Sequence, residues 1–195
     1  MEKKFMRFLA LDIGNVCIKL EHERLLSQLG MSPEFFASAP IKDLVRRLEF
    51  GLCSADEFFR ELGRFPELRK YDDAALRAGY RALLGNPLPG MPELLRRLPD
   101  HGILPVFFSD ISVFHLNCCR DIMPEMQRYP GIYSFDTHAY KPSPEMFAQF
   151  ESIYGVPVFY TDDRSDLIAA AQQRNWPAAV FHSVAELLRQ LGVNR

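Results

Sequence analysis

Four short apolar runs along the chain each end in polar residues, and these runs predict buried strands. They span residues 5–13, 103–108, 157–160 and 178–181. A continuous apolar run of this length, bounded by loop residues, is typical of a strand that is covered on both faces. Asp12 lies at the end of the first run, and Ser109 and Asp162 follow the second and third.

Helix start signals stand between these runs. Ser143 precedes Pro144, which predicts a capped helix with proline in its first turn. Two serines have a glutamate three residues later, at Ser54 and Ser183, as in a capping box. Segments 92–98 and 166–174 are the remaining predicted helices, which cross from one strand to the next. Strands alternating with helices predict an α/β fold, a doubly wound parallel sheet with helices on both faces.

The segment from residue 21 to 88 has a different pattern. It shows helical periods, a turn at Phe50-Gly51 and no clear strand, and it leads into a Pro- and Gly-rich hinge over residues 88–92. We therefore expect a core domain over residues 1–20 and 89–195, with a helical cap over residues 21–88. The alternative is that these helices form one more layer of the same core.

Composition narrows the function classes. The chain has 195 residues, 48% of them apolar, and a net charge of −2, which offers no electrostatic case for nucleic acid or an anionic membrane. No apolar run is long enough to span a bilayer. The four cysteines lack metal-binding spacing, so free thiols and a cytoplasmic location are expected. The expected partner is a small molecule, and the chain is expected to be a monomer or a homodimer.

Carboxylates follow three of the predicted strands. The carboxyl ends of parallel strands meet at one edge of the sheet, so Asp12, Ser109-Asp110 and Asp162-Asp163 are expected to lie together. Adjacent carboxylates repel one another and call for a cation, and oxygen-only ligands suit Mg²⁺. The alternative for Asp162 and Asp163 is a solvated acidic loop.

Two further residues suit a phosphate group. Lys141 stands before Pro142 and a capped helix, so its ammonium group is expected to be held rigidly against an anion. The hydroxyl of Ser109 and the backbone amides that follow it can hold a phosphate oxygen. The alternatives are a surface lysine and a simple helix cap.

As a set and in this order, four motifs resemble those of the haloacid dehalogenase-like (HAD) hydrolase superfamily. They are residues 12–16 (Asp-Ile-Gly-Asn-Val), 108–110 (Phe-Ser-Asp), 141–142 (Lys-Pro) and 161–163 (Thr-Asp-Asp). The cap segments 48–51 and 54–59 also look like that family. The most similar branch holds the phosphatase domain of soluble epoxide hydrolase and small bacterial sugar-phosphate phosphatases.

The resemblance implies a role for each motif. Asp12 would attack phosphorus and form an aspartyl phosphate, while Ser109, Asp110 and Lys141 would lie around the phosphoryl group. Mg²⁺ would be held by Asp12, the backbone carbonyl of Gly14, Asp163 and, through a supporting contact, Asp162. The expected activity is Mg²⁺-dependent hydrolysis of a small phosphorylated metabolite.

Three positions depart from the family pattern. Gly14 stands where most family phosphatases have the acid that protonates the leaving group, and losing such an acid typically costs about 10²–10⁴ in rate. Asp110 replaces the usual Asn and is a candidate replacement acid. Leu167 stands where the family usually has Asp or Asn, although Asp166 is adjacent.

These departures motivate a second hypothesis, a catalytically decayed protein that binds a phosphorylated ligand or a protein partner. Two further readings are weaker. A 2-haloacid dehalogenase needs no Mg²⁺, which the acidic pair argues against. A phosphorelay receiver domain has its acidic pair near the N-terminus, whereas here the pair is Asp162-Asp163.

Overall fold

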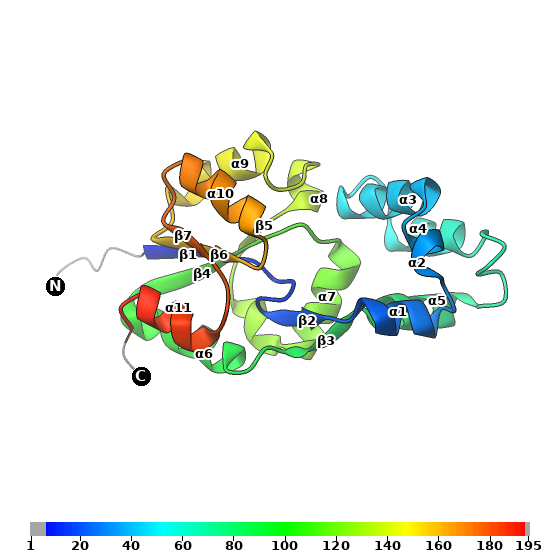
Figure 1. Cartoon of the computed structure of the whole chain (residues 1–195), viewed down its shortest axis with the longest axis horizontal. Helices are drawn as coiled ribbons and strands as arrows, with labels where there is room; N and C mark the ends of the chain where they lie inside the picture. Colours follow the sequence, from blue (N-terminus) through cyan, green and yellow to red (C-terminus); the bar gives the residue numbers. More distant parts are fainter. Residues whose placement is uncertain (1–6, 194–195) are drawn as a thin grey trace.

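A five-stranded parallel sheet in the order β5-β4-β1-β6-β7 forms the centre of one half of the molecule (Figure 1). The computed structural model describes residues 7–193, so the first two positions of the run that begins at Phe5 lie outside the described residues. The strands of the sheet are β1 (Arg7–Leu11), β4 (Ile103–Ser109), β5 (Gly131–Tyr133), β6 (Phe159–Asp162) and β7 (Ala178–Val180). All neighbouring pairs are parallel, which confirms the predicted α/β class.

Strand β1 shows why the sheet is covered on both faces. Successive side chains of a strand alternate between faces, so Leu9 and Leu11 enter one hydrophobic core and Ala10 enters the other. The first core is shared with α6 (Met91–Arg97), α7 (Val113–Ile122) and α11 (Val184–Gln190). The second is shared with α9 (Pro144–Tyr154) and α10 (Ser165–Gln173). The doubly wound arrangement is therefore confirmed.

Short elements join these helices and strands, and each predicted capping serine accepts a backbone hydrogen bond at the start of its helix. The short elements are α8 (Ser134–Thr137) and the 3₁₀ helices η1 (Leu98–His101) and η2 (Pro124–Arg128). Ser143 caps α9 by accepting a hydrogen bond from the Met146 amide. Ser54 and Glu57 form the complete capping box of α4. At α11 the Ser183 side chain accepts from the Glu186 amide.

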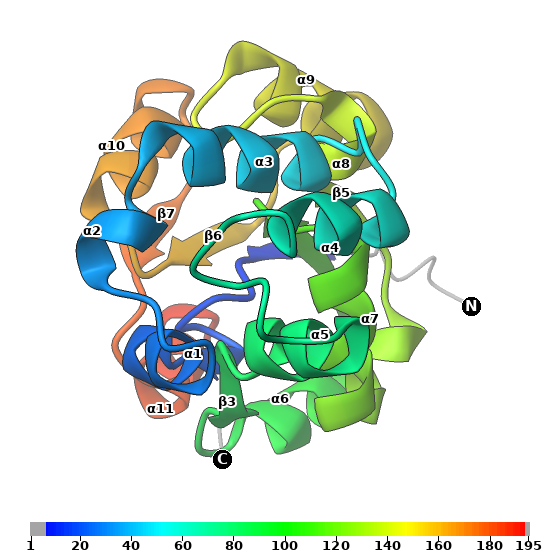
Figure 2. The same cartoon turned by 90° about the vertical axis from the view of Figure 1, so that its right-hand side faces the viewer.

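Within residues 7–193, five helices form the other half of the molecule, to the right in Figure 1 and facing the viewer in Figure 2. They are α1 (His22–Gln28), α2 (Pro33–Phe36), α3 (Ala39–Glu49), α4 (Ala55–Leu62) and α5 (Asp73–Arg81). They bury a hydrophobic core of their own that includes Leu44, Phe58 and Tyr80. We call this group of helices, residues 22–81, the cap. Its independence as a domain stays a prediction.

A pair of antiparallel strands, β2 (Ile18–Leu20) and β3 (Leu84–Pro87), connects the two halves. Strand β3 corrects the expectation that residues 21–88 contain no strand. Its sequence, Leu-Gly-Asn-Pro, has no apolar alternation, because this strand exists through its pairing with β2 rather than through a local pattern. The three-residue strand β5 was not predicted either.

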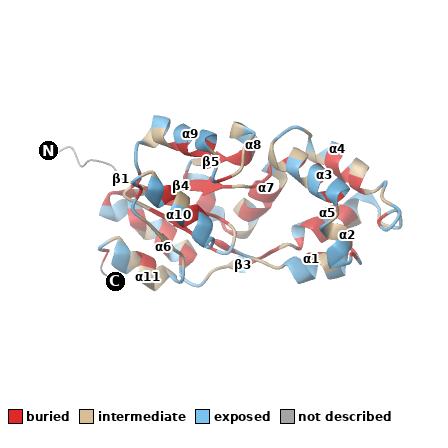
Figure 3. Cartoon of the chain, turned by 45° about the horizontal axis from the view of Figure 1, so that its top comes forward, coloured by how far each residue is buried: buried red, intermediate tan, exposed pale blue. Residues whose placement is uncertain are grey.

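The cap and the sheet domain also meet at helix α7. Phe114 packs against the hydrophobic cores of both halves. Next to it, the buried His115 ring stacks on Tyr80 of the cap at 4.4 Å and lies 3.1 Å from the Tyr80 carbonyl oxygen. Buried residues concentrate in the strands and on the inward faces of the helices (Figure 3). Within residues 7–193 no helix has the length and apolar character needed to cross a membrane.

Candidate active site

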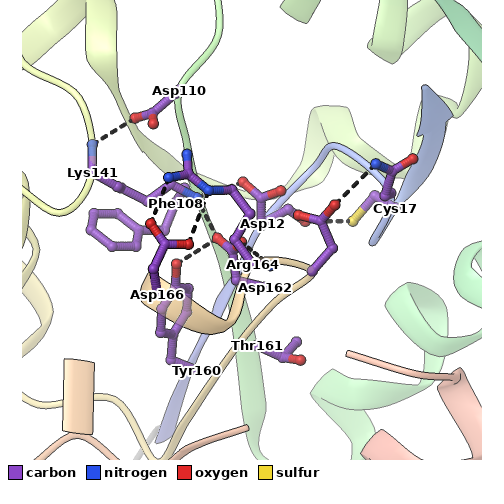
Figure 4. Close-up of polar contacts among 12 residues, drawn as sticks. Asp12, Cys17, Phe108, Asp110, Lys141, Tyr160, Thr161, Asp162, Arg164 and Asp166 are labelled. Carbon is purple, nitrogen blue, oxygen red and sulfur yellow. Dashed lines mark hydrogen bonds and ion pairs between the residues drawn. The ribbon is translucent and has the colours of Figure 1, made fainter. Parts of the chain in front are cut away.

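The side chain of Lys141 lies buried at the carboxyl edge of the sheet, between two carboxylates (Figure 4). Its Nζ donates to Asp12 Oδ1 at 2.7 Å, to Asp162 Oδ2 at 2.6 Å and to the Phe108 carbonyl oxygen at 2.9 Å. These partners come from the ends of β1, β6 and β4. The structure thus brings together residues that are up to 150 positions apart, at the edge where the sequence pattern expected them.

Both oxygens of Asp162 are already engaged by the protein. Besides Lys141, the Tyr160 hydroxyl donates to Oδ2 at 2.6 Å, and the Arg164 backbone amide donates to Oδ1 at 3.0 Å. Only 1% of the Asp162 surface is exposed, so these hydrogen bonds replace its hydration. Asp162 is therefore a buried anchor that fixes the Lys141 ammonium group.

Asp163 points to the exposed side of the same edge. One carboxylate oxygen from each of Asp12, Asp162 and Asp163 lies within 4.8 Å of the others, a grouping that can hold a metal ion. Asn15 Nδ2 donates to Asp163 Oδ2 at 3.0 Å, while Asn15 Oδ1 accepts from the Leu20 amide at 3.0 Å. Asn15 has φ +51°, a left-handed conformation that Asn tolerates better than most residues.

The electrostatics of this cluster show an excess of negative charge. Burial raises the pKa of Asp12 to about 7, although the ammonium group of Lys141 acts in the opposite direction. Burial alone would lower the pKa of Lys141, but the surrounding acids, Asp12 foremost, raise it well above its ordinary value. Lys141 is therefore charged at neutral pH, and it is the only cation in direct contact with the Asp12 and Asp162 carboxylates among the described residues.

The remaining predicted residues surround this cluster. Ser109 ends β4 and is 3% exposed. Asp110, half-buried, accepts a hydrogen bond through Oδ1 from the Lys141 backbone amide at 2.9 Å. Burial also raises the pKa of Asp110. Gly14 lies in the loop after β1, and a Cβ atom there would stand 2.9 Å from Leu20 Cδ1 and 3.8 Å from Asp12 Oδ2.

The two residues at the start of α10 turn away from the cluster. Leu167, 1% exposed, is buried in the sheet domain. Asp166 binds the guanidinium group of Arg164 through two hydrogen bonds of 2.7 and 3.2 Å, and both side chains are more than half exposed. The family pattern has Asp or Asn at the position of Leu167, and Asp166 does not replace that side chain, because it is bound to Arg164 instead.

Sequence reasoning missed Tyr160 and Cys17 as members of the site. The Cys17 thiol donates to the Asp12 carbonyl oxygen at 3.2 Å. Tyr160 stands two residues before Asp162, and strand alternation puts both side chains on one face. That spacing is the signal that could have identified Tyr160. For Cys17, which lies in a loop, no comparable local signal exists.

Comparison with protein-family models finds no match for the sequence, and comparison with curated proteins finds none. Solved structures do match. The HAD family enzyme BT-2542 from Bacteroides thetaiotaomicron has a TM-score of 0.82 at 19% identity, over 95% of this chain and 98% of that chain. A structure of that enzyme in complex with magnesium and inorganic phosphate has a TM-score of 0.74 at 20% identity, over 92% of this chain and 96% of that chain.

Two other matches differ in chemistry. A HAD phosphatase from Thermococcus onnurineus has a TM-score of 0.64 at 17% identity, over 97% of this chain and 100% of that chain. An L-2-haloacid dehalogenase from Xanthobacter autotrophicus, with chloropropionic acid covalently bound, has a TM-score of 0.61 at 14% identity, over 96% and 83%. The chain thus has the HAD-like fold that its motifs predict. Because this fold carries both chemistries, the function must be argued from the site.

Proposed function

We propose that this protein is a Mg²⁺-dependent phosphatase that hydrolyses a small phosphomonoester through an aspartyl phosphate on Asp12. The observation that carries the proposal is the buried cluster in which Lys141 joins Asp12 and Asp162, with Asp163 beside them. A dehalogenase needs a nucleophilic carboxylate but no group of acids that can hold a metal ion. The acidic group therefore favours phosphoryl transfer.

The residues fit a magnesium ion. Mg²⁺ prefers oxygen ligands, and Asp12, Asp163 and the Gly14 carbonyl would hold it, with Asp162 supporting from the buried side. Burial raises the pKa of Asp12, and the charge of Asp162 adds to this rise; a divalent cation beside the carboxylate would favour its ionised form. When bound, the ion polarises the phosphoryl group and keeps the Asp12 carboxylate ionised.

The chain's own residues supply the rest of the mechanism. Asp12 attacks phosphorus. Lys141 Nζ donates to Asp12 Oδ1 at 2.7 Å, and this hydrogen bond fixes the direction of the carboxylate for the attack. Ser109 binds an equatorial oxygen of the transferring group. The Lys141 ammonium group, whose three N–H groups donate to Asp12, Asp162 and Phe108, offsets the charge of the phosphoryl group. Water then cleaves the aspartyl phosphate and restores Asp12. The solved structures add support, since BT-2542 is described with magnesium and phosphate and the Thermococcus protein as a phosphatase.

Phosphate release from p-nitrophenyl phosphate, measured with Mg²⁺ and with EDTA, tests the proposal. Wild-type protein is expected to release phosphate only with Mg²⁺, and Asp12→Asn to lose at least about 10³-fold of that rate. Asp136→Asn is the matched control, because Asp136 is an exposed carboxylate outside the site. Equal rates for wild type and Asp12→Asn would contradict the proposal.

The second candidate is a protein that binds a phosphorylated ligand without turnover. It is favoured by Gly14, where the Leu20 side chain occupies the space next to Cα that an acid would need. Calorimetry separates the two candidates. Binding of a phosphorylated metabolite with Mg²⁺, together with no phosphate release over hours, would favour the binding protein.

A further inference from the structure

The cap contacts the active-site edge of the sheet domain at the last residues of α3. The Tyr140 hydroxyl donates to Glu49 Oε2 at 2.6 Å, and the Ser134 hydroxyl donates to the Glu49 carbonyl oxygen at 2.7 Å. The Phe50 ring packs edge-on against Tyr140 at 4.5 Å. Figure 2 shows α3 beside α8, in agreement with the contact between the two helices.

These contacts connect the Glu49 carboxyl group of the cap to the loop that holds Lys141. Tyr140 directly precedes Lys141, whose Nζ contacts Asp12, and the backbone amide of Lys141 binds Asp110. Glu49 lies near enough to Asp110 for the Asp110 charge to act on its carboxyl group. Glu49 is thus fixed on the cap side of the edge, within the electrostatic reach of the residues around the phosphoryl position.

The environment of Glu49 favours its protonated form. Burial raises the pKa of Glu49 to about 7; the hydrogen bond from Tyr140 acts against this rise, and the charge of Asp110 adds to it. Tyr80 of α5 also lies within electrostatic reach of Glu49. The Lys141 ammonium group acts to lower the pKa of Asp110, against the effect of burial.

Phosphoryl transfer places the nucleophile and the leaving oxygen roughly in line on opposite sides of phosphorus. Asp12 attacks from the sheet edge, so the leaving oxygen faces the cap. Asp110 follows β4 on the same edge as Asp12, and the Lys141 amide already occupies one of its oxygens. Glu49 belongs to the cap, across this edge from Asp12, whereas Asp110 belongs to the edge itself.

On this geometry, we infer that Glu49 is a catalytic residue that donates the proton to the leaving group. It would replace the general acid for which Gly14 is substituted in this chain. This inference rests on the proposed phosphatase function. Tyr140 is a positioning residue, since it holds the Glu49 carboxyl and connects it to the Lys141 loop.

The steps balance in atoms and charge. In the first, an Asp12 oxygen forms a bond to phosphorus, the bond from phosphorus to the ester oxygen breaks, and that oxygen takes the Glu49 proton to leave as an alcohol. In the second, water attacks the phosphorus of the aspartyl phosphate. The bond to Asp12 breaks, phosphate leaves, and one water proton returns to Glu49.

Glu49→Gln tests this role, because the amide keeps the shape but holds no acidic proton. Two probes are compared with Mg²⁺: p-nitrophenyl phosphate, whose leaving group needs little protonation, and 2-glycerophosphate, whose alkoxide needs a proton. We expect a loss of about 10²–10⁴-fold on 2-glycerophosphate and less than about tenfold on p-nitrophenyl phosphate. Glu23→Gln, on an exposed position of α1, is the control, and thermal melting checks folding.

The pH profile gives a second readout. A general acid must be protonated, so wild-type hydrolysis of 2-glycerophosphate falls as the pH rises through about 7, and Glu49→Gln loses this fall. An equal loss on both esters, or a leaving-group-dependent loss in Asp110→Asn instead of Glu49→Gln, would overturn the role of Glu49 alone. Wild-type protein without phosphate release from either ester would overturn the phosphatase function, and the inference with it.

Discussion

Replacing Lys141 by methionine removes the ammonium group and keeps most of the side-chain volume. The variant leaves Asp12 and Asp162 facing each other without a cation, and their side chains are only 9% and 1% exposed. Breaking a buried ion pair by removing one partner typically costs about 3–5 kcal/mol. Since Lys141 makes two such pairs and a further hydrogen bond to Phe108, we expect a loss in this range despite relief by carboxyl protonation.

Urea unfolding at pH 7 measures this loss. In EDTA the full deficit is expected, and excess Mg²⁺ should reduce it, because the ion restores positive charge beside the same carboxylates. Lys19→Met is the matched control. Lys19 is 62% exposed and lies 3.6 Å from Glu21, so its loss should stay within about 0.5 kcal/mol. A Lys141→Met protein within about 1 kcal/mol of wild type in EDTA would refute the reasoning.

Two further predictions concern the contacts between the cap and the sheet domain. Burial lowers the pKa of His115 to about 4 from 6.5, so its protonation favours unfolding; the stability present above pH 6.5 falls by roughly 3 kcal/mol as the pH drops to 4, and urea titrations should show a smaller fall for His115→Gln. The same fall of the unfolding free energy with pH in wild type and His115→Gln would contradict this. Gly51→Ala strains a residue with φ +66° and places Cβ 2.8 Å from the Phe135 carbonyl oxygen, whereas Gly192→Ala strains the same φ with no atom within 4 Å. Gly51→Ala should therefore cost over about 1 kcal/mol and more than Gly192→Ala in thermal melting, and equal costs would show that the Phe135 contact yields freely.

The strands and their carboxyl edge could be predicted because their signals are local. Three of the four apolar runs end at a candidate functional residue, and the parallel topology brings Asp12, Ser109 and Asp162 together without further information. Lys141 was expected to face an anion because it stands before a capped helix, and the family resemblance implied its place beside the phosphoryl group. Asp12, Ser109 and Asp162 depend on the sheet alone, which the pattern of the sequence specifies well.

The contacts between the cap and the sheet domain could not be predicted in this way. Glu49 meets Tyr140 across 91 positions of the sequence, and nothing in either local segment encodes that approach. Likewise, the different roles of Asp162 and Asp163 depend on their burial. Asp162 is buried among hydrogen-bond donors, whereas Asp163 is exposed. Strand β3 escaped prediction for the same reason, because its partner β2 lies outside the segment.

Trapping the covalent intermediate tests the central claim most directly. Protein turning over p-nitrophenyl phosphate with Mg²⁺ is quenched in acid and reduced with borohydride, which converts an aspartyl phosphate to homoserine. Peptide mass spectrometry should then find homoserine at position 12 with substrate and Mg²⁺, and aspartate there when either is omitted. Steady turnover with intact aspartate at position 12, or with homoserine at another aspartate, would contradict the account.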